Sequence, residues 1–177
     1  MSEQLDLIVI GAGPGGYVAA VRASQLGLKV AVVEKSRVGG VCLNWGCIPS
    51  KNLLHQAELF HSLKEMEAVG VKVERSGLDY GAVQASSRKV VDTLTGGVAG
   101  LLKRNQVTLI EGSAKITGKG EVTVTTDSGE SKLKATNILV ATGSRPMQVP
   151  GFECDEQRLL SSNGILAMTE LPKSLVI

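Results

Sequence analysis

Residues 5–16 read LDLIVIGAGPGG, an apolar run of strand length that leads directly into the spacing G-x-G-x-x-G. Small apolar residues at helical spacing follow as far as Gly27, and residues 29–33 form a second apolar run. A strand, a glycine-rich turn, a helix and a second strand make a β-α-β unit. The sequence therefore predicts an α/β fold, a Rossmann-like doubly wound parallel sheet.

Four glycines in this turn are the candidate phosphate-binding residues: Gly11, Gly13, Gly15 and Gly16. The first glycine of the motif permits a tight turn, the second lets backbone amides approach a pyrophosphate, and the last lets helix and strand pack closely. Glu34 ends the second strand, 18 residues beyond Gly16, where a carboxylate can accept hydrogen bonds from an adenosine ribose. This unit predicts a bound dinucleotide, but it does not separate FAD from NAD.

A second informative stretch, residues 39–54, reads GGVCLNWGCIPSKNLL and places Cys42 and Cys47 five residues apart. On a regular helix such residues are separated by about 7.5 Å along the axis, whereas the α-carbons of a disulfide lie about 4.4–6.8 Å apart. A bridge therefore requires a distorted first turn. Gly46 and Pro49 permit one, because glycine adopts unusual dihedral angles and proline interrupts the backbone donors.

The surroundings of the cysteine pair are typical of a redox disulfide. A small ring held under strain is easily reduced. Lys51 follows one turn after Cys47, and a cation there, together with the amino end of a helix, favours the thiolate form. Electrons from a dithiol must pass to a group that accepts a thiolate adduct and later gives up hydride, which favours FAD as the cofactor.

Three other interpretations of the pair stay open: two unrelated core cysteines, a structural disulfide and half of a zinc site. A zinc site needs further ligands, and besides carboxylates the chain offers only Cys154, His55 and His61, without a second paired motif, so no metal is predicted. The acidic opening MSEQLD lacks the basic region of a signal peptide, which predicts a reducing, cytoplasmic compartment. Disulfides in such a compartment are usually catalytic or redox-sensing.

Composition bounds the function further. The chain has 177 residues, of which 43% are apolar, enough for a real core. Its 19 basic and 17 acidic residues are spread without runs, which argues against nucleic-acid and membrane-surface partners. No apolar run approaches the length that spans a bilayer.

The later sequence predicts two long helices, residues 47–68 and residues 79–105, the second capped by its first residue. Gly96, Gly97 and Gly100 weaken this second helix, so we expect close packing or a break near Gly96. Strands are expected at residues 71–73, 107–111, 122–126, 132–134 and 137–141. The polar strands among them alternate like an antiparallel hairpin and predict an inserted β-meander.

At these motifs the chain resembles the class I pyridine nucleotide-disulfide oxidoreductases, and within them the dihydrolipoamide dehydrogenases. Besides the cysteine motif, the segments that carry the resemblance are residues 94–98, 112–114, 141–146 and 171–177, so it covers essentially the whole chain. Leu43 and Ile48 favour the lipoamide enzymes over glutathione or mercuric reductase, which usually carry valine there. Trp45 stands where many members have valine.

The resemblance implies two catalytic residues: Cys42 as the thiol that exchanges with a dithiol substrate, and Cys47 as the thiol beside the flavin. Lys51 would lie near the flavin ring and favour its reduced form. The remaining FAD contacts that it implies, beside the motif glycines, are Glu34, Lys35, Gly39, Gly40, Val41, Cys42, Ala114, Thr142, Gly143 and Ser144. The implied activity is oxidation of dihydrolipoyl groups, with electrons passing through the disulfide and FAD to NAD. The implied partner is the dihydrolipoyl domain of a 2-oxo acid dehydrogenase or glycine cleavage complex, and the implied assembly is a homodimer.

The resemblance also predicts the domain organisation. We assign residues 1–147 to an FAD-binding domain, and residues 148–177 to a linker, with a short helix that Ser161 begins, and the first strand, at residues 175–177, of an otherwise absent NAD-binding domain. Family members are more than twice as long, and the fold expected here is incomplete at its carboxyl end. We therefore expect no NAD-linked turnover from the chain alone. Two alternatives stay open: another disulfide reductase, of the mercuric or glutathione type, and an FAD-binding fragment without catalysis.

Overall fold

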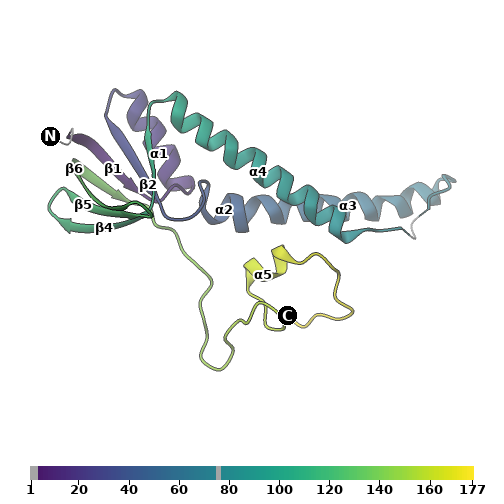
Figure 1. Ribbon diagram of the computed structural model, residues 1–177. Helices are drawn as coiled ribbons and strands as arrows, with labels where there is room; N and C mark the ends of the chain where they lie inside the picture. Colours follow the sequence, from purple (N-terminus) through teal and green to yellow (C-terminus); the bar gives the residue numbers. More distant parts are fainter. Residues whose placement is uncertain (1–3, 75–76) are drawn as a thin grey trace. The chain divides into compact units, whose positions relative to one another are not determined.

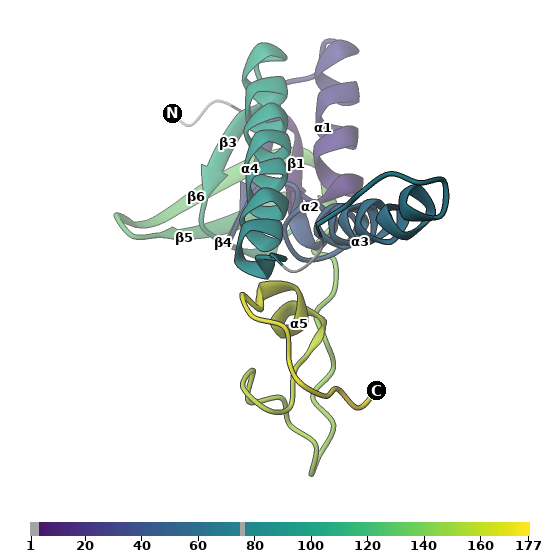
Figure 2. The same ribbon diagram turned by 90° about the vertical axis from the view of Figure 1, so that its right-hand side faces the viewer.

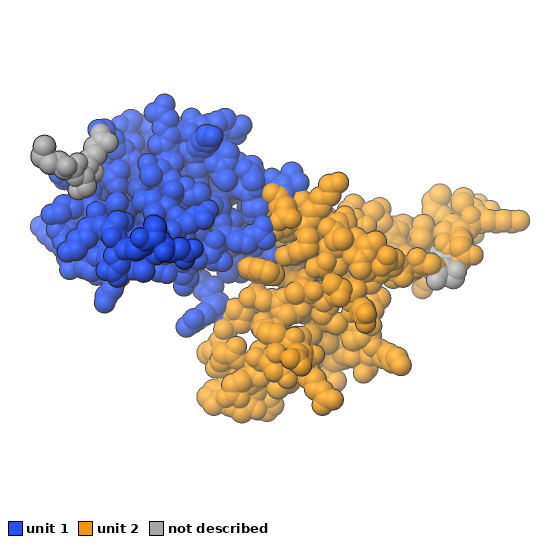
Figure 3. Space-filling view, in the orientation of Figure 1, with its two compact units in different colours: residues 1–44, 93–145 blue, residues 45–92, 146–177 orange. Residues whose placement is uncertain are grey.

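The computed structural model describes residues 4–74 and 77–177, which form two compact units. The first unit contains Met1–Asn44 and Thr93–Arg145, and the second contains Trp45–Asp92 and Pro146–Ile177 (Figure 3). The units are interleaved along the chain, whereas the two predicted domains are consecutive, so the boundary after residue 147 stays a prediction. Each unit is described by itself.

The order of elements confirms the predicted α/β class (Figure 1). The helices are α1 (Pro14–Gln25), α2 (Gly40–Trp45), α3 (Cys47–Ala68), α4 (Tyr80–Arg104) and α5 (Ser162–Ala167). The strands are β1 (Leu5–Ile10), β2 (Val30–Glu34), β3 (Thr108–Glu111), β4 (Ser113–Gly118), β5 (Glu121–Thr126) and β6 (Gly129–Val140). The long helix predicted over residues 47–68 has the predicted bounds.

The first unit is built on a sheet with the strand order β3-β2-β1-β6-β5-β4. β1 pairs in parallel with β2 on one side and with β6 on the other, and β2 pairs in parallel with β3. Ile8 and Val9 of β1 are fully buried, as a central strand covered on both faces requires. This placement explains why residues 5–10 form a nearly continuous apolar run.

β6 belongs to two pairings at once. Its first half is antiparallel to β5, with Glu121 opposite Lys134, and its second half is parallel to β1, with Leu5 opposite Ala135. The sequence predicted separate strands at residues 132–134 and 137–141. That division is wrong, because one twelve-residue strand leaves the polar meander and enters the buried sheet without interruption.

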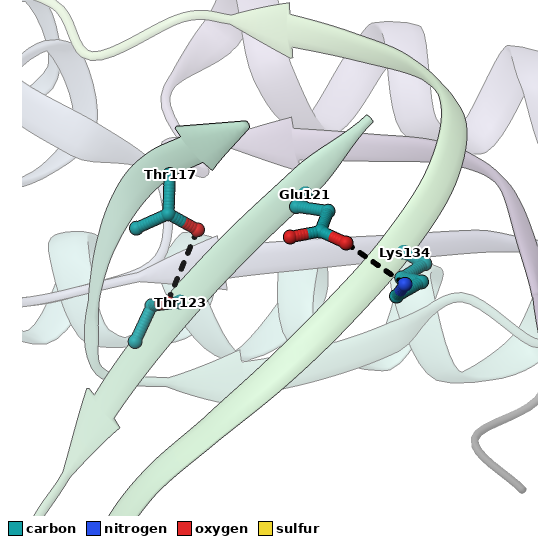
Figure 4. A network of polar contacts seen from close by, with 4 residues as sticks. All are labelled: Thr117, Glu121, Thr123 and Lys134. Carbon is teal, nitrogen blue, oxygen red and sulfur yellow. Dashed lines mark hydrogen bonds and ion pairs between the residues drawn. The ribbon is translucent and has the colours of Figure 1, made fainter. Parts of the chain in front are cut away.

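The inserted antiparallel β-meander of β4, β5 and β6 is present (Figure 4). Cross-strand side chains bond on its exposed surface: Thr117 and Thr123 hydroxyls lie 3.2 Å apart, and Lys134 Nζ lies 2.8 Å from Glu121 Oε1. Val122 and Val124 point the other way, into the core with Ile8 and Val33. The alternation of polar and apolar residues therefore follows the strand period of two.

α1 follows the first glycine-rich turn and packs on the parallel strands through small residues, of which Gly16, Ala20 and Ala23 are buried. Figures 1 and 2 show α1 beside the carboxyl-terminal part of α4. The Ser24 hydroxyl donates a hydrogen bond to the Asn105 carbonyl oxygen there. This bond ties the carboxyl end of α1 to the end of α4.

In the second unit, helix α4 begins at the predicted cap, since the Ala82 amide donates to Asp79 Oδ1 at 3.2 Å. Ser161 caps α5 in the same way, by accepting a hydrogen bond from the Asn163 amide at 3.1 Å. The strands predicted at residues 71–73 and 175–177 are wrong, because neither segment has strand structure.

The prediction of close packing or a break near Gly96 is also wrong. The helix continues through Gly96, Gly97 and Gly100, and among the described residues nothing packs within 4 Å of a Cβ added at any of the three. Buried Val98 and Leu102 anchor the same part of the helix. Their burial offsets the roughly 1 kcal/mol by which each glycine disfavours a helix. Across residues 4–74 and 77–177, no helix has the length and apolar character of a membrane span.

Candidate functional site

The turn after β1 depends on glycine for steric reasons. Gly11 has a φ of +103°, and a Cβ there would overlap the carbonyl oxygen of Ala141. A Cβ on Gly16 would overlap the carbonyl oxygen of Gly11, whereas one on Gly15 would meet nothing within 4 Å. Two of the predicted glycines are therefore required by close packing of the turn, and Gly15 stands in open space at the amino end of α1.

A second glycine pair lies against this turn. The Gly39 amide donates to the Ala12 carbonyl at 2.8 Å, and a Cβ on Gly40 would come within 2.7 Å of the Gly13 α-carbon. Both Gly39 and Gly40 have positive φ, at +96° and +58°. The segment before the cysteine motif is thus brought onto the turn by backbone contacts that side chains would prevent.

Glu34 joins three segments at the end of β2. Its carboxylate accepts a hydrogen bond from the Ala12 amide at 2.7 Å and another from the Ser36 amide at 2.9 Å. Its carbonyl oxygen accepts one from the Gly112 amide, at the corner between β3 and β4, at 2.8 Å. An ionised carboxylate offers about four acceptor positions, so Glu34 retains capacity to accept hydrogen bonds from hydroxyl groups.

The residues after β6 lie at the same edge of the sheet. The Ala141 amide donates to the Ile10 carbonyl at 2.9 Å, which places the start of residues 142–144 beside the turn after β1. Thr142, Gly143 and Ser144 are exposed. The chain order reverses between β1 and β6, and ligands of open α/β sheets bind at such a switch point, outside the carboxyl ends of the strands.

The structure therefore gathers most of the predicted cofactor residues at one edge of the first unit. Lys35 directly follows β2, and Val41 lies in the first turn of α2. Both side chains are exposed. Ala114 lies on β4, packed against the core cluster beside the corner that bonds to Glu34. Lys51 belongs to the second unit, where it is exposed near the start of α3. The cofactor roles of these residues stay predictions.

Cys42 and Cys47 are both disulfide-bonded, and Cys154 is free. Because the chain has three cysteines, the first two are bonded to each other. Cys42 lies on α2 and is half-buried, and Cys47 begins α3 and is exposed. The pairing excludes unrelated thiols. Within the described ranges no group of three metal-binding side chains occurs.

The distortion that the bridge requires is present at Gly46. Its dihedral angles, φ −146° and ψ −113°, interrupt the helix, so that α2 ends at Trp45 and α3 starts at Cys47. Pro49 is buried in the first turn of α3. The sequence expectation for Gly46 is confirmed, since a break replaces the continuous helix in which the two sulfurs could not meet.

Two side chains in this region had no predicted role. Asn44 is only 1% exposed, and its amide nitrogen donates to the carbonyl oxygens of Val38 and Gly40 at 3.0 and 2.9 Å. It fixes the segment between the two glycines and the disulfide. In the second unit, the guanidinium carbon of Arg88 lies 5.5 Å from the centre of the Trp45 ring. The only sequence signal for Asn44 was a polar residue inside an apolar motif. Nothing in the sequence indicated the contact between Arg88 and Trp45.

Comparison with known proteins bears on this arrangement. A family model described as pyridine nucleotide-disulphide oxidoreductase matches residues 5–177. The dihydrolipoyl dehydrogenase of Bacillus subtilis (strain 168) is 47% identical over 174 residues, which cover 98% of this chain and 37% of that protein. The leghemoglobin reductase of Vigna unguiculata is 46% identical over 179 residues, 99% of this chain and 34% of that protein. The chain thus spans just over a third of the length of these relatives.

Solved structures share the fold. The crystal structure of LpdA from Mycobacterium tuberculosis superposes with a TM-score of 0.84 at 23% identity, over 95% of this chain and 38% of that one. The Cu(II) complex of the HOCl-induced flavoprotein disulfide reductase RclA from Escherichia coli gives a TM-score of 0.79 at 25% identity, over 96% and 36%.

Proposed function

Since the chain belongs to the pyridine nucleotide-disulphide oxidoreductase family, we propose that the protein it forms oxidises dihydrolipoyl groups through the Cys42–Cys47 disulfide. The observation that carries this proposal is the small ring closed across the Gly46 break, directly after a segment packed on the glycine-rich turn that follows β1. Identities of about 45% to several dihydrolipoyl dehydrogenases support the substrate class. FAD and NAD are the cofactors that go with it.

The residues at the sheet edge fit FAD. The approach of Gly40 to Gly13 leaves no room for a Cβ, and such a backbone surface suits a pyrophosphate. Glu34 can accept hydrogen bonds from ribose hydroxyls beside it. Gly11, Gly13, Gly15 and Gly16 would hold the phosphates, and Lys35, Gly39 to Cys42, Lys51, Ala114 and Thr142 to Ser144 would line the rest of the site. Bound FAD would supply a two-electron acceptor that returns a hydride to NAD.

The chain's own chemistry is thiol–disulfide exchange. One thiolate of the substrate attacks a sulfur of the Cys42–Cys47 bond, which breaks and releases the other cysteine as a thiolate. The second substrate thiolate then attacks the mixed disulfide, so that the substrate leaves as a cyclic disulfide. The substrate has lost two electrons and the cysteine pair has gained them. The two protons of the substrate thiols remain for Cys42, Cys47 or solvent.

The site of the first attack and the partners follow from the family resemblance. By the family resemblance Cys42 exchanges with the substrate and Cys47 faces the flavin. The substrate would be a dihydrolipoyl group carried on a domain of a 2-oxo acid dehydrogenase or glycine cleavage complex, and the active protein would be a homodimer. Catalytic disulfides suit a reducing compartment, here the cytoplasm.

The proposal is tested by comparing electron donors and acceptors in the whole protein. We expect rapid NAD reduction with dihydrolipoamide and little NADPH-dependent reduction of glutathione disulfide or Hg²⁺. The second candidate function, a glutathione or mercuric reductase, predicts the reverse preference. A Cys42→Ser variant is the matched control, because it removes exchange and leaves the phosphate-binding glycines intact.

A further inference from the structure

The ring closed by Cys42 and Cys47 contains one large aromatic side chain. Trp45 is the last residue of α2, three positions after Cys42 and two before Cys47, and it is the single tryptophan of the chain. Its side chain is half-buried. The helix break at Gly46 directly follows Trp45. The position of the Trp45 side chain therefore affects the backbone path between the two cysteines.

Arg88 holds this indole from helix α4. Its guanidinium carbon lies 5.5 Å from the centre of the Trp45 ring, within the range of a cation–π contact. The Nε and Nη2 atoms of Arg88 are buried from solvent. Beside it on the helix, Ser87 is 1% exposed and Val91 fully buried, so the arginine projects from a well-packed turn. Cation–π contacts are strongest where, as here, the cation is partly desolvated.

We propose that Trp45 and Arg88 act as positioning residues that keep the redox ring in its closed conformation after the disulfide has been reduced. The inference rests on the proposed function of the disulfide and concerns its reduction potential. A backbone held at Trp45 has less freedom to move the two thiols apart. Their effective concentration toward each other is therefore high, which favours the disulfide over the dithiol.

A cation near a redox site can also act through its charge, and that effect shifts the equilibrium between disulfide and dithiol in the opposite direction. If Arg88 acted by its charge, it would stabilise a thiolate and favour the reduced form. Removal of Arg88 would then make the disulfide harder to reduce. If Arg88 acts through its hold on Trp45, removal makes the disulfide easier to reduce. The direction of change therefore separates the two mechanisms.

The test is equilibration of the whole protein with mixtures of reduced and oxidised dithiothreitol at pH 7. In this exchange the Cys42–Cys47 bond breaks, the cyclic disulfide of dithiothreitol forms, and two electrons and two protons pass to the cysteine pair. Residual thiols are alkylated, and the tryptic peptide of residues 38–51, which carries both cysteines, is quantified by mass.

We expect Trp45→Val and Arg88→Met each to shift the equilibrium toward the dithiol by about fivefold, the size of one partly desolvated cation–π contact. The double variant should shift it no further than either single change, because both remove the same contact. Trp45→Phe keeps an aromatic face and should restore most of the parent value. Lys103→Met removes a positive charge elsewhere on α4 and should leave the equilibrium unchanged.

An unchanged equilibrium in folded Trp45→Val and Arg88→Met, additive effects in the double variant, or a shift of Arg88→Met toward the disulfide would each overturn the inference. Melting temperatures identify a variant that fails to fold, and the other single variant, Arg88→Met or Trp45→Val, then carries the comparison. Failure of the proposed function looks different: peptide 38–51 of the parent protein would show no reversible exchange at all.

Discussion

The carboxylate of Glu34 accepts a hydrogen bond from the backbone amide of Ala12 at 2.7 Å, which joins the end of β2 to the glycine-rich turn after β1. The two residues are 22 positions apart in the chain. The bond places an anionic acceptor directly beside the surface on which a pyrophosphate would lie. We therefore expect the strength of FAD binding to depend on the Glu34 side chain.

Replacing Glu34 by alanine should weaken FAD binding. A hydrogen bond to a charged group is worth roughly 1.5–3 kcal/mol, so the dissociation constant should rise by about tenfold to a hundredfold. Equilibrium titration of the released flavin measures it. Glu111→Ala is the matched control, because Glu111 pairs with Glu34 across the neighbouring strand and is exposed. Equal losses in the two variants would exclude a specific role for Glu34.

Alanine at Gly16 should destabilise the fold, and alanine at Gly15 should not. A Cβ at Gly16 would overlap the Gly11 carbonyl, and overpacking of this kind typically costs about 1–3 kcal/mol. Gly15 lies in open space within α1, where alanine favours the helix by about 0.5–1 kcal/mol. Urea unfolding of both variants measures the free energies. A stability loss at Gly15 as large as at Gly16 would contradict the packing described for this turn.

Cys47→Ser should leave FAD bound and abolish any long-wavelength absorbance of a thiolate beside the flavin. The reason is that serine matches the size of cysteine but supplies no thiolate near neutral pH. Cys42→Ser should instead leave the Cys47 thiol free and keep that absorbance. Anaerobic spectra of the two FAD-loaded variants make the comparison. If the band survived in Cys47→Ser and vanished in Cys42→Ser, the two roles would be exchanged.

The Glu121–Lys134 pair on the meander gives a prediction about pH (Figure 4). The hydrogen bond from Lys134, and then its charge, lower the pKa of Glu121, with a smaller effect from Lys132. Because the folded pKa lies below the unfolded one, the pair contributes stability above the unfolded pKa and loses it as the pH falls through the folded pKa. Both groups are solvent-exposed, so the contribution is small.

Lys134→Met should therefore raise the pKa of Glu121 toward its ordinary value, and Lys132→Met should raise it less. NMR titration of the Glu121 side chain measures both shifts. A larger effect of the Lys132 change would show that the hydrogen bond at 2.8 Å does not govern the titration.

The sequence predicted the elements that local pattern determines. The glycine spacing after an apolar run predicted the turn at Gly11, and the period of 3.6 predicted α3 with its exact bounds. It did not predict one continuous β6. The composition changes from polar to apolar at Ala135, and this change is the same whether one strand ends there or a single strand passes from the meander into the core. It expected close packing or a break near Gly96, whereas the helix continues through open space there, held by the burial of Val98 and Leu102.

The sequence predicted the Cys42–Cys47 pair and only some of the contacts around it, and the cofactor roles of the other residues stay predictions. Cys42, Cys47 and the need for distortion at Gly46 follow from covalent geometry, which sequence spacing determines. The contact of Trp45 with Arg88 joins positions 43 residues apart and depends on how α4 packs in its unit. No local pattern encodes such a contact, and the same holds for the bond between Glu34 and Ala12.

The most direct test of the central claim is an anaerobic absorbance spectrum of the FAD-loaded protein before and after one equivalent of dihydrolipoamide. We predict that the flavin spectrum gains a long-wavelength thiolate band while peptide 38–51 changes from disulfide to dithiol. A flavin spectrum that stays unchanged, with the Cys42–Cys47 bond intact in that peptide, would contradict the assignment of this ring as the redox centre for dihydrolipoyl groups.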